Sequence, residues 1–77
     1  MAIRAFVFIE CTPGKASQVA TAAAKLPGVA MAHAVTGAYD VIALVEAEGT
    51  TALGEFVSLR LHRIPHVLKT TTNVVVR

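Results

Sequence analysis

One internal repeat constrains the fold of this chain more than any other feature of its sequence. Residues 25–29 read KLPGV and residues 63–67 read RIPHV, so basic, apolar, proline and valine positions recur 38 residues later. The same shift aligns six further pairs of identical or similar residues: Ile3 with Val41, Ala5 with Ala43, Val7 with Val45, Glu10 with Glu48, Thr12 with Thr50 and Val19 with Val57. Because two such copies nearly fill the 77 residues, the pattern predicts one supersecondary unit used twice.

Each copy opens and closes with a segment typical of a β-strand. Residues 3–9 and 40–47 are rich in β-branched and aromatic side chains over a strand's usual length, and they predict the opening strands. Residues 29–36 and 67–76 carry the same kind of side chains and predict the closing strands.

A helix is predicted between the two strands of each copy. Thr12 before Pro13 in the first copy, and Thr50 in the second, are typical of helix N-termini, while Pro27 and Pro65 predict the helix ends. The resulting order, βαββαβ, predicts an α+β chain of the ferredoxin-like class. We therefore expect a single domain over residues 1–77, with a four-stranded antiparallel sheet and two helices on one face.

The sheet face without helices is predicted to be an interface. Side chains alternate along a strand, so Phe6 and Phe8 share this face, as do Ile42 and Leu44 in the third strand. An antiparallel sheet that faces water on one side normally carries polar residues there. The chain is also 55% apolar and only 16% charged, where soluble proteins average about 25% charged residues. These observations predict a homo-oligomer, most simply a two-fold dimer through Phe6, Phe8, Ile42 and Leu44.

Composition and residue pattern disfavour several classes of function. The seven basic residues are scattered, without a stripe or a recognition helix, so direct DNA binding is not expected. No apolar run approaches the length of a membrane span, and the single cysteine fits a reducing compartment, so we expect a cytoplasmic location and no membrane association. The histidines, at 33, 62 and 66, lack metal-ligand spacing, so neither a metal nor a cofactor is expected.

The hairpin between the second and third strands carries the most unusual residues. Gly37 permits a tight turn and Asp40 can accept bonds from nearby backbone N–H groups, which turn formation alone would explain. Tyr39 is the one tyrosine, and a turn gives an aromatic ring no local role. Two interpretations stay open for Tyr39: it packs on a neighbouring subunit, or it forms the wall of a pocket.

The whole chain resembles the ligand-binding domain, called RAM, of the Lrp/AsnC family of regulators. The resemblance is carried by VTGAYDVIALVEA at 35–47, which contains the pattern Gly-x-Tyr-Asp between two apolar strands. It extends to PGK at 13–15, LPGV at 26–29, IPHV at 64–67 and the threonines at 70–72. Two departures are visible: the chain starts directly with strand one, without the helix-turn-helix of full-length members, and His66 replaces a common glycine. It therefore resembles the stand-alone form of the domain.

This resemblance implies a regulatory function that depends on assembly. Family members form dimers through the open sheet faces, the dimers form closed rings, and a free amino acid binds between dimers beside the Gly-x-Tyr-Asp loop. The implied ligand-binding residues are Gly37, Ala38, Tyr39, Asp40, Thr70 and Thr72. The implied partners are an amino acid or related small molecule, further copies of the chain, and a full-length Lrp/AsnC regulator. A role in transcriptional or metabolic regulation follows.

Two other functions remain as alternatives. Ferredoxin-like dimers also include small enzymes of the monooxygenase type, but the predicted core offers only His33 as a base, so we expect no catalysis. The other alternative is a ligand-free assembly partner of a full-length regulator. Thr70 and Thr72 also have a simpler explanation, because threonine favours strands.

Overall fold

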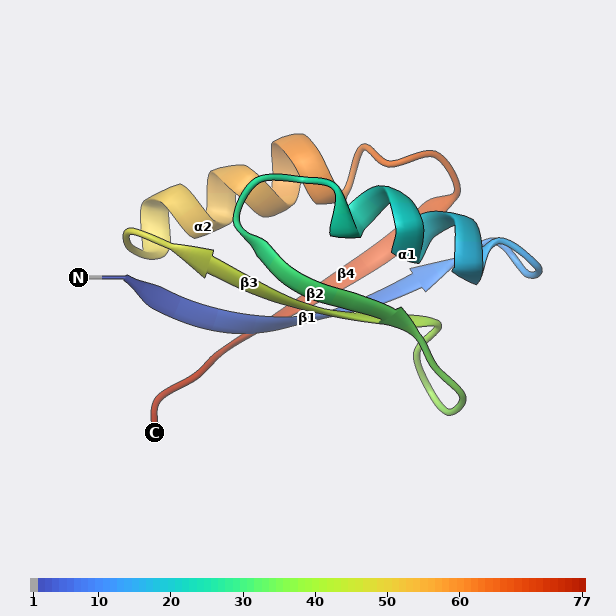
Figure 1. Cartoon of the computed structure of the whole chain (residues 1–77), viewed down its shortest axis with the longest axis horizontal. Coiled ribbons are helices and arrows are strands. Elements are labelled where there is room, and N and C mark those ends of the chain that lie inside the picture. The colour runs from blue at the N-terminus through green and yellow to red at the C-terminus, as the bar shows by residue number, and fades with distance from the viewer. Residues whose placement is uncertain (1) are drawn as a thin grey trace.

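A computed structural model describes residues 2–77 and confirms the predicted order of elements (Figure 1). Along the described part of the chain no helix is long and apolar enough to cross a membrane. The elements are β1 (Ile3–Cys11), α1 (Ala16–Ala24), β2 (Val29–Ala34), β3 (Val41–Ala47), α2 (Thr50–Phe56), the π-helical turn η1 (Val57–Leu61) and β4 (Val67–Val74).

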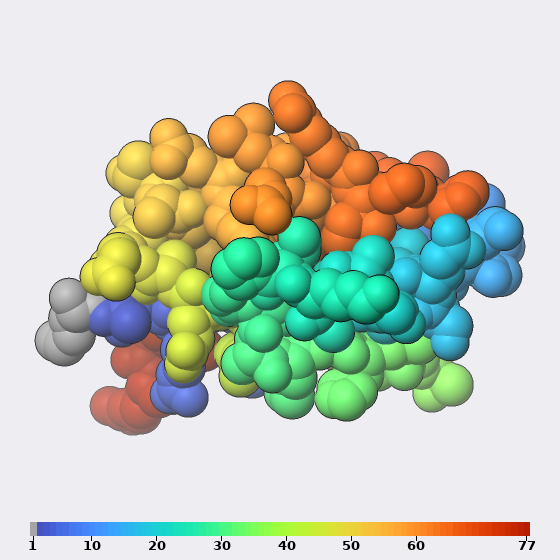
Figure 2. All heavy atoms as spheres, turned by 45° about the horizontal axis from the view of Figure 1, so that its top comes forward, coloured from blue at the N-terminus to red at the C-terminus, as the bar shows by residue number. Residues whose placement is uncertain are grey.

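The four strands form one antiparallel sheet in the order β2-β3-β1-β4. The first strand of each repeat is therefore central and the second strand of each repeat is an edge. Both helices lie on the same face of this sheet, as Figure 1 shows, and Figure 2 shows the two helical segments covering that face side by side. The α+β class and the βαββαβ topology predicted from the repeat are confirmed.

The core lies between the helices and one face of the two central strands. Ala5, Val7 and Ile9 of β1 are fully buried there, and they meet Leu53 of α2 and Leu61 of η1. The remaining buried side chains are Cys11, Val19, Ala20, Ala23, Val41, Ala43, Val45 and Val57. Alternation along β1 and β3 directs the next residue of each strand to the opposite face, which carries no helix and is termed the open face.

The predicted helix starts are partly wrong. α1 begins at Ala16, because residues 12–15 form a turn in which the Lys15 N–H donates to the Thr12 carbonyl at 3.1 Å. Gly14 in this turn has φ +84°, which no α-helix contains, so the threonine and proline do not begin the helix. In the second copy the helix begins at Thr50 with Gly49 as its N-cap, so Thr50 is the first helical residue and not the cap.

The repeat recurs in the backbone where each helix turns into its closing strand. The N–H of Val29 donates to the Leu26 carbonyl, and the N–H of Val67 donates to the Ile64 carbonyl, both at 3.2 Å. Gly28 and His66 precede these valines and both are left-handed, with φ +94° and +78°. His66 is thus a histidine in a backbone conformation that favours glycine.

Replacing His66 with glycine should stabilise the protein. The left-handed conformation costs a residue with a Cβ roughly 1–2 kcal/mol, and the extra chain entropy that glycine loses on folding offsets about half of that. His66 is exposed, so few side-chain contacts are lost. We expect a gain of about 0.5–1 kcal/mol and a melting temperature several degrees higher, measured by calorimetry.

The matched control is the same position in the first copy. At Gly28 an added Cβ would lie 3.1 Å from the Glu46 carbonyl oxygen and would also meet the positive φ, so Gly28→Ala should lower the melting temperature. A His66→Gly variant that melts below the wild type would contradict the strain argument.

Candidate functional site

The loop over residues 35–40 is fixed to the end of β1 by Asp40. The Asp40 carboxylate accepts a 2.9 Å hydrogen bond from the backbone N–H of Cys11. The Asp40 N–H donates to the Ile9 carbonyl at 3.0 Å, and the Asp40 carbonyl accepts from the Val35 N–H at 3.0 Å. One residue therefore joins the loop, β1 and the end of β2. Gly37 lies at the exposed tip with φ +119°, as expected for a turn glycine.

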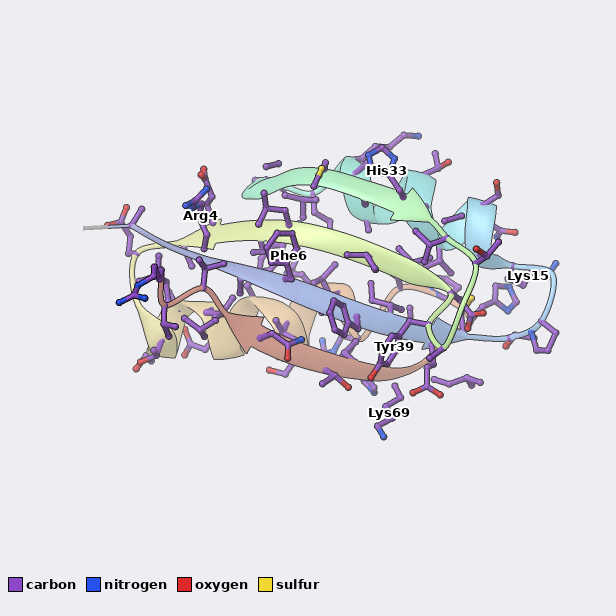
Figure 3. All side chains as sticks on the ribbon, turned by 90° about the horizontal axis from the view of Figure 1, so that it is seen from below. Arg4, Phe6, Lys15, His33, Tyr39 and Lys69 are labelled. Carbon is purple, nitrogen blue, oxygen red and sulfur yellow. The ribbon has the colours of Figure 1, made fainter. Side chains whose placement is uncertain are left out.

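Tyr39 packs on Phe8 of the open face. The two ring centroids lie 4.7 Å apart and the ring planes are tilted by 37°, a distance typical of interacting aromatic pairs. Tyr39 is half-buried by this contact within its own chain. The loop thus bends over the open face, and Figure 3 shows Tyr39 on that side of the sheet. An intrachain partner was not among the two interpretations that the sequence left open for this ring.

The threonines of β4 divide between the two sheet faces. Thr72 pairs with Val7 and Thr70 pairs with Ile9, so their side chains share the helix-covered face of the sheet. Thr71 pairs with Phe8, which places it on the open face near Tyr39. Within one chain the structure therefore brings together Gly37, Ala38, Tyr39 and Asp40, and it does not bring Thr70 and Thr72 to the side of the sheet where Tyr39 packs. Sequence reasoning passed over Thr71, and only the strand register identifies it.

The four residues predicted for the dimer interface share the open face. Phe6 pairs with Leu44 and Phe8 pairs with Ile42 across the two central strands. The Phe6 side chain is 36% exposed, and the other three are half-buried. Met31, opposite Leu44 on β2, extends this apolar surface and is 41% exposed. Figure 3 looks onto this face, with Arg4 at one end and Tyr39 and Lys69 toward the other.

Cys11 is a buried thiol beside the loop. Burial raises the pKa of Cys11, and the neighbouring Asp40 carboxylate raises it further. The thiol is therefore protonated at neutral pH and is a poor nucleophile, which fits a structural role. Over residues 2–77 no group of three His, Cys, Asp or Glu side chains could hold a metal ion.

A shallow hollow of about 440 Å³ lies between α1 and β2 and extends to Ala34, directly before the loop. Its wall consists of Ser17, Ala20, Thr21, Ala24, Lys25, Ala32, His33 and Ala34. His33 is thus the one imidazole in a mostly small-residue wall that includes no carboxylate. Such a wall does not supply the acid–base pair that an active site of the monooxygenase type would need.

Comparison with known proteins assigns the chain to a family. The model of the Lrp/AsnC ligand-binding domain matches residues 4–77. The chain belongs to this family.

Individual relatives agree with this assignment. An uncharacterized HTH-type transcriptional regulator of Pyrococcus abyssi is 33% identical over 94% of this Lrp/AsnC domain and 46% of the regulator. The crystal structure of TTHA0845 from Thermus thermophilus superposes with a TM-score of 0.89 at 33% identity, covering 97% of this chain and 94% of that one. A regulator of Neisseria meningitidis, solved as a complex with L-Met, has the same fold at 22% identity, with a TM-score of 0.85 over 97% of this chain and 50% of its own.

The chain spans about half the length of the curated relatives it matches. Both are HTH-type transcriptional regulators, so the shared segment corresponds to the regulatory, ligand-binding part of such proteins.

Proposed function

We propose that this Lrp/AsnC domain binds a free amino acid or a close relative, and that it regulates transcription or metabolism through protein–protein contacts without catalysis. One observation carries the proposal: Asp40 and Tyr39 anchor the Gly37–Asp40 segment at the rim of the apolar open face. Three hydrogen bonds of Asp40, one to its carboxylate and two through its backbone, together with the Tyr39–Phe8 contact fix this part of the loop before any ligand arrives. A preorganised loop loses little entropy on binding.

The chemistry of the loop suits an amino acid. A carboxylate offers about four lone-pair positions, and the Cys11 N–H occupies one of those on Asp40. The remaining positions can accept bonds from a ligand ammonium group, while the exposed backbone at Gly37 and Ala38 can donate to its carboxylate. The L-Met complex of the Neisseria regulator shows that a protein of this fold binds an amino acid.

A second subunit completes the site in this proposal. Thr70 and Thr72 lie on the other side of the sheet from Tyr39, so their hydroxyl groups reach a ligand at the loop only from a neighbouring copy. Dimers formed through Phe6, Phe8, Ile42 and Leu44, which then associate into a ring, provide such neighbours. Ligand binding between subunits would change the stability of the assembly, and this coupling is the proposed regulatory output.

The proposal is tested by calorimetric melting of the purified protein with each of the twenty amino acids in turn. A ligand at 100 times its dissociation constant adds about 2.7 kcal/mol of stability when one site binds the native state only. For a domain of this size that corresponds to a shift of roughly 10 °C or more. We expect a shift with one or a few related amino acids.

A series in which no amino acid moves the transition would contradict amino-acid binding. It would favour the second candidate, a ligand-free partner of a full-length Lrp/AsnC regulator. That candidate is supported by the curated relatives, because they contain the same domain within chains about twice as long. Co-expression with such a regulator and measurement of the mass of the complex would then distinguish the two.

A further inference from the structure

The outer edge of β2 presents backbone hydrogen-bonding groups that no strand among residues 2–77 pairs with. β2 is the outermost strand on its side of the sheet, and Figure 3 shows His33 on it, with α1 behind. The Val35 N–H donates to the Asp40 carbonyl at the end of β3, and bonded and non-bonded pairs alternate along antiparallel strands. The N–H and C=O groups of Ala34 and Ala32 therefore point away from β3, toward the outside of the sheet.

β2 lacks the side chains that usually stop an edge strand from pairing further. Soluble proteins commonly protect such edges with lysine, other charged residues or proline. From Val29 to Ala34 the strand reads VAMAHA, which contains no proline, lysine, arginine, aspartate or glutamate. By contrast, β4 at the opposite edge carries Lys69. The bulge of β2 lies between Val29 and Met31, so the register from Met31 to Ala34 is regular and suits a further strand.

The hollow between α1 and β2 lies beside these free backbone groups. Ala32 and Ala34 form its strand side, and Ala20, Thr21 and Ala24 form much of its helix side. Because these side chains are small, they leave a space of about 440 Å³ next to the strand. Residues opposite one another on paired strands point to the same face of the sheet. A strand added to β2 would therefore direct the side chains opposite Ala32 and Ala34 into the hollow.

The ionisable side chains of the hollow are both bases. Lys25 and His33 line it, both are exposed, and its wall contains no carboxylate. Lys25 is the C-cap of α1 and so lies toward the end of the hollow where β2 begins. An acidic segment complements this charge. The outermost charged side chains of this chain, Arg4 and Arg77, are basic, so neither end of a second copy matches the hollow.

We propose that β2 binds an extended acidic peptide segment of another protein as an additional antiparallel strand. Small side chains at alternate positions of the peptide occupy the hollow, and a carboxylate reaches Lys25. Peptides that extend a sheet gain affinity from main-chain hydrogen bonds and specificity from alternate side chains. The inference goes beyond the proposed amino-acid site and does not depend on it, because Tyr39 packs on the open face whereas the hollow lies on the helix-covered side.

A synthetic peptide, acetyl-Ala-Glu-Ala-Thr-Glu-amide, tests the proposal on the full chain. In the antiparallel register its two alanines lie opposite Ala34 and Ala32, and its last glutamate lies near Lys25. We expect the Ala32 and Ala34 amides to exchange hydrogen rapidly without peptide and more slowly with it, and the NMR signals of Ala24 to shift. The same peptide with lysine at both glutamate positions should bind several-fold more weakly at low salt. Equal binding of the two peptides would contradict the acidic preference.

N-methylation of the peptide separates strand addition from attraction between charges. The N–H of its second alanine would donate to the Ala32 carbonyl, so a methyl group there should weaken binding about fivefold or more. The N–H of its first glutamate would point away from β2, so methylation at that position is the matched control and should change the affinity little. If the two methylated peptides bind equally well, the peptide does not add to β2 as a strand.

Variants of the chain test the hollow itself. Ala24→Leu fills it from an exposed helical position, and Lys25→Glu reverses its charge; leucine and glutamate both favour helices, so α1 should stay folded. Both variants should weaken binding about fivefold or more, whereas Gln18→Leu, on α1 outside the hollow, should not. Absence of any amide shift with millimolar peptide would overturn the proposal. Slow exchange of Ala32 and Ala34 without peptide would also overturn it, because another copy of the chain would then cover the edge.

Discussion

In the proposed open-face dimer, arginine in place of Phe6 should separate the two copies into monomers. Phe6 lies at the centre of the open face, 36% exposed and flanked by Leu44. In a face-to-face dimer the new guanidinium would be buried among apolar side chains without a partner, which costs several kcal/mol. Two such charges enter each dimer because the proposed interface is two-fold. We therefore expect the dissociation constant to rise by about a thousandfold or more, at about 1.4 kcal/mol for each factor of ten.

The measurement is molecular mass by light scattering, with circular dichroism to confirm that the chain stays folded. Leu59→Arg is the matched control, because Leu59 is also an exposed large apolar residue, 51% exposed, but it belongs to η1 in the helical layer. Leu59→Arg should keep the dimer mass. A Phe6→Arg protein that remains dimeric would place the interface elsewhere.

The fold was predictable because the same pattern of predicted strands and helix occurs in both halves of the sequence. The shift of 38 residues aligns two weak helix and strand patterns, and agreement between them removes most of the ambiguity of either one. The sequence also predicted that β1 and β3 carry apolar side chains on both faces of the sheet. Side chains alternate along a strand, so each one can be assigned to a face without knowledge of the neighbouring strands. The open face and its four central residues followed from that alternation alone.

Features that depend on distant pairing were not predictable. Thr70, Thr71 and Thr72 look alike in the sequence, and only the register of β4 against β1 shows which of them shares a face with Phe8. The partner of the Asp40 carboxylate, Cys11, lies 29 residues away along the chain. Local turn chemistry explains Asp40 as a turn residue, but it does not show that the carboxylate joins two segments.

The second helix illustrates a limit of periodicity. The spacing of Leu53, Val57 and Leu61 predicts one continuous helix, and the chain does stay helical over this range. The last turn is nevertheless π-helical, with the His62 N–H donating to the Val57 carbonyl at 2.8 Å. One extra residue in the turn rotates the later side chains about the helix axis, which a pattern with a fixed period of about 3.6 residues does not reveal.

Replacing Asp40 with alanine should abolish amino-acid binding and also destabilise the fold. The Cys11 N–H would lose its acceptor at a buried residue, and an unsatisfied buried donor costs about 1–3 kcal/mol. The melting temperature should fall by roughly 4 °C or more. A loss of binding by this variant is therefore ambiguous, because a displaced loop gives the same result as a missing ligand contact.

Asp40→Asn separates the two roles of the carboxylate. The amide oxygen of asparagine can still accept from the Cys11 N–H, so the melting temperature without ligand should stay close to that of the wild type. The negative charge is removed, and a hydrogen bond to a charged group contributes about 1.5–3 kcal/mol, so affinity for the amino acid should fall at least about tenfold. Titration calorimetry with the amino acid that shifts the wild-type melt measures this directly. If Asp40→Asn binds that ligand as tightly as the wild type, the carboxylate serves only to join the loop to β1, and the ammonium group must be recognised elsewhere.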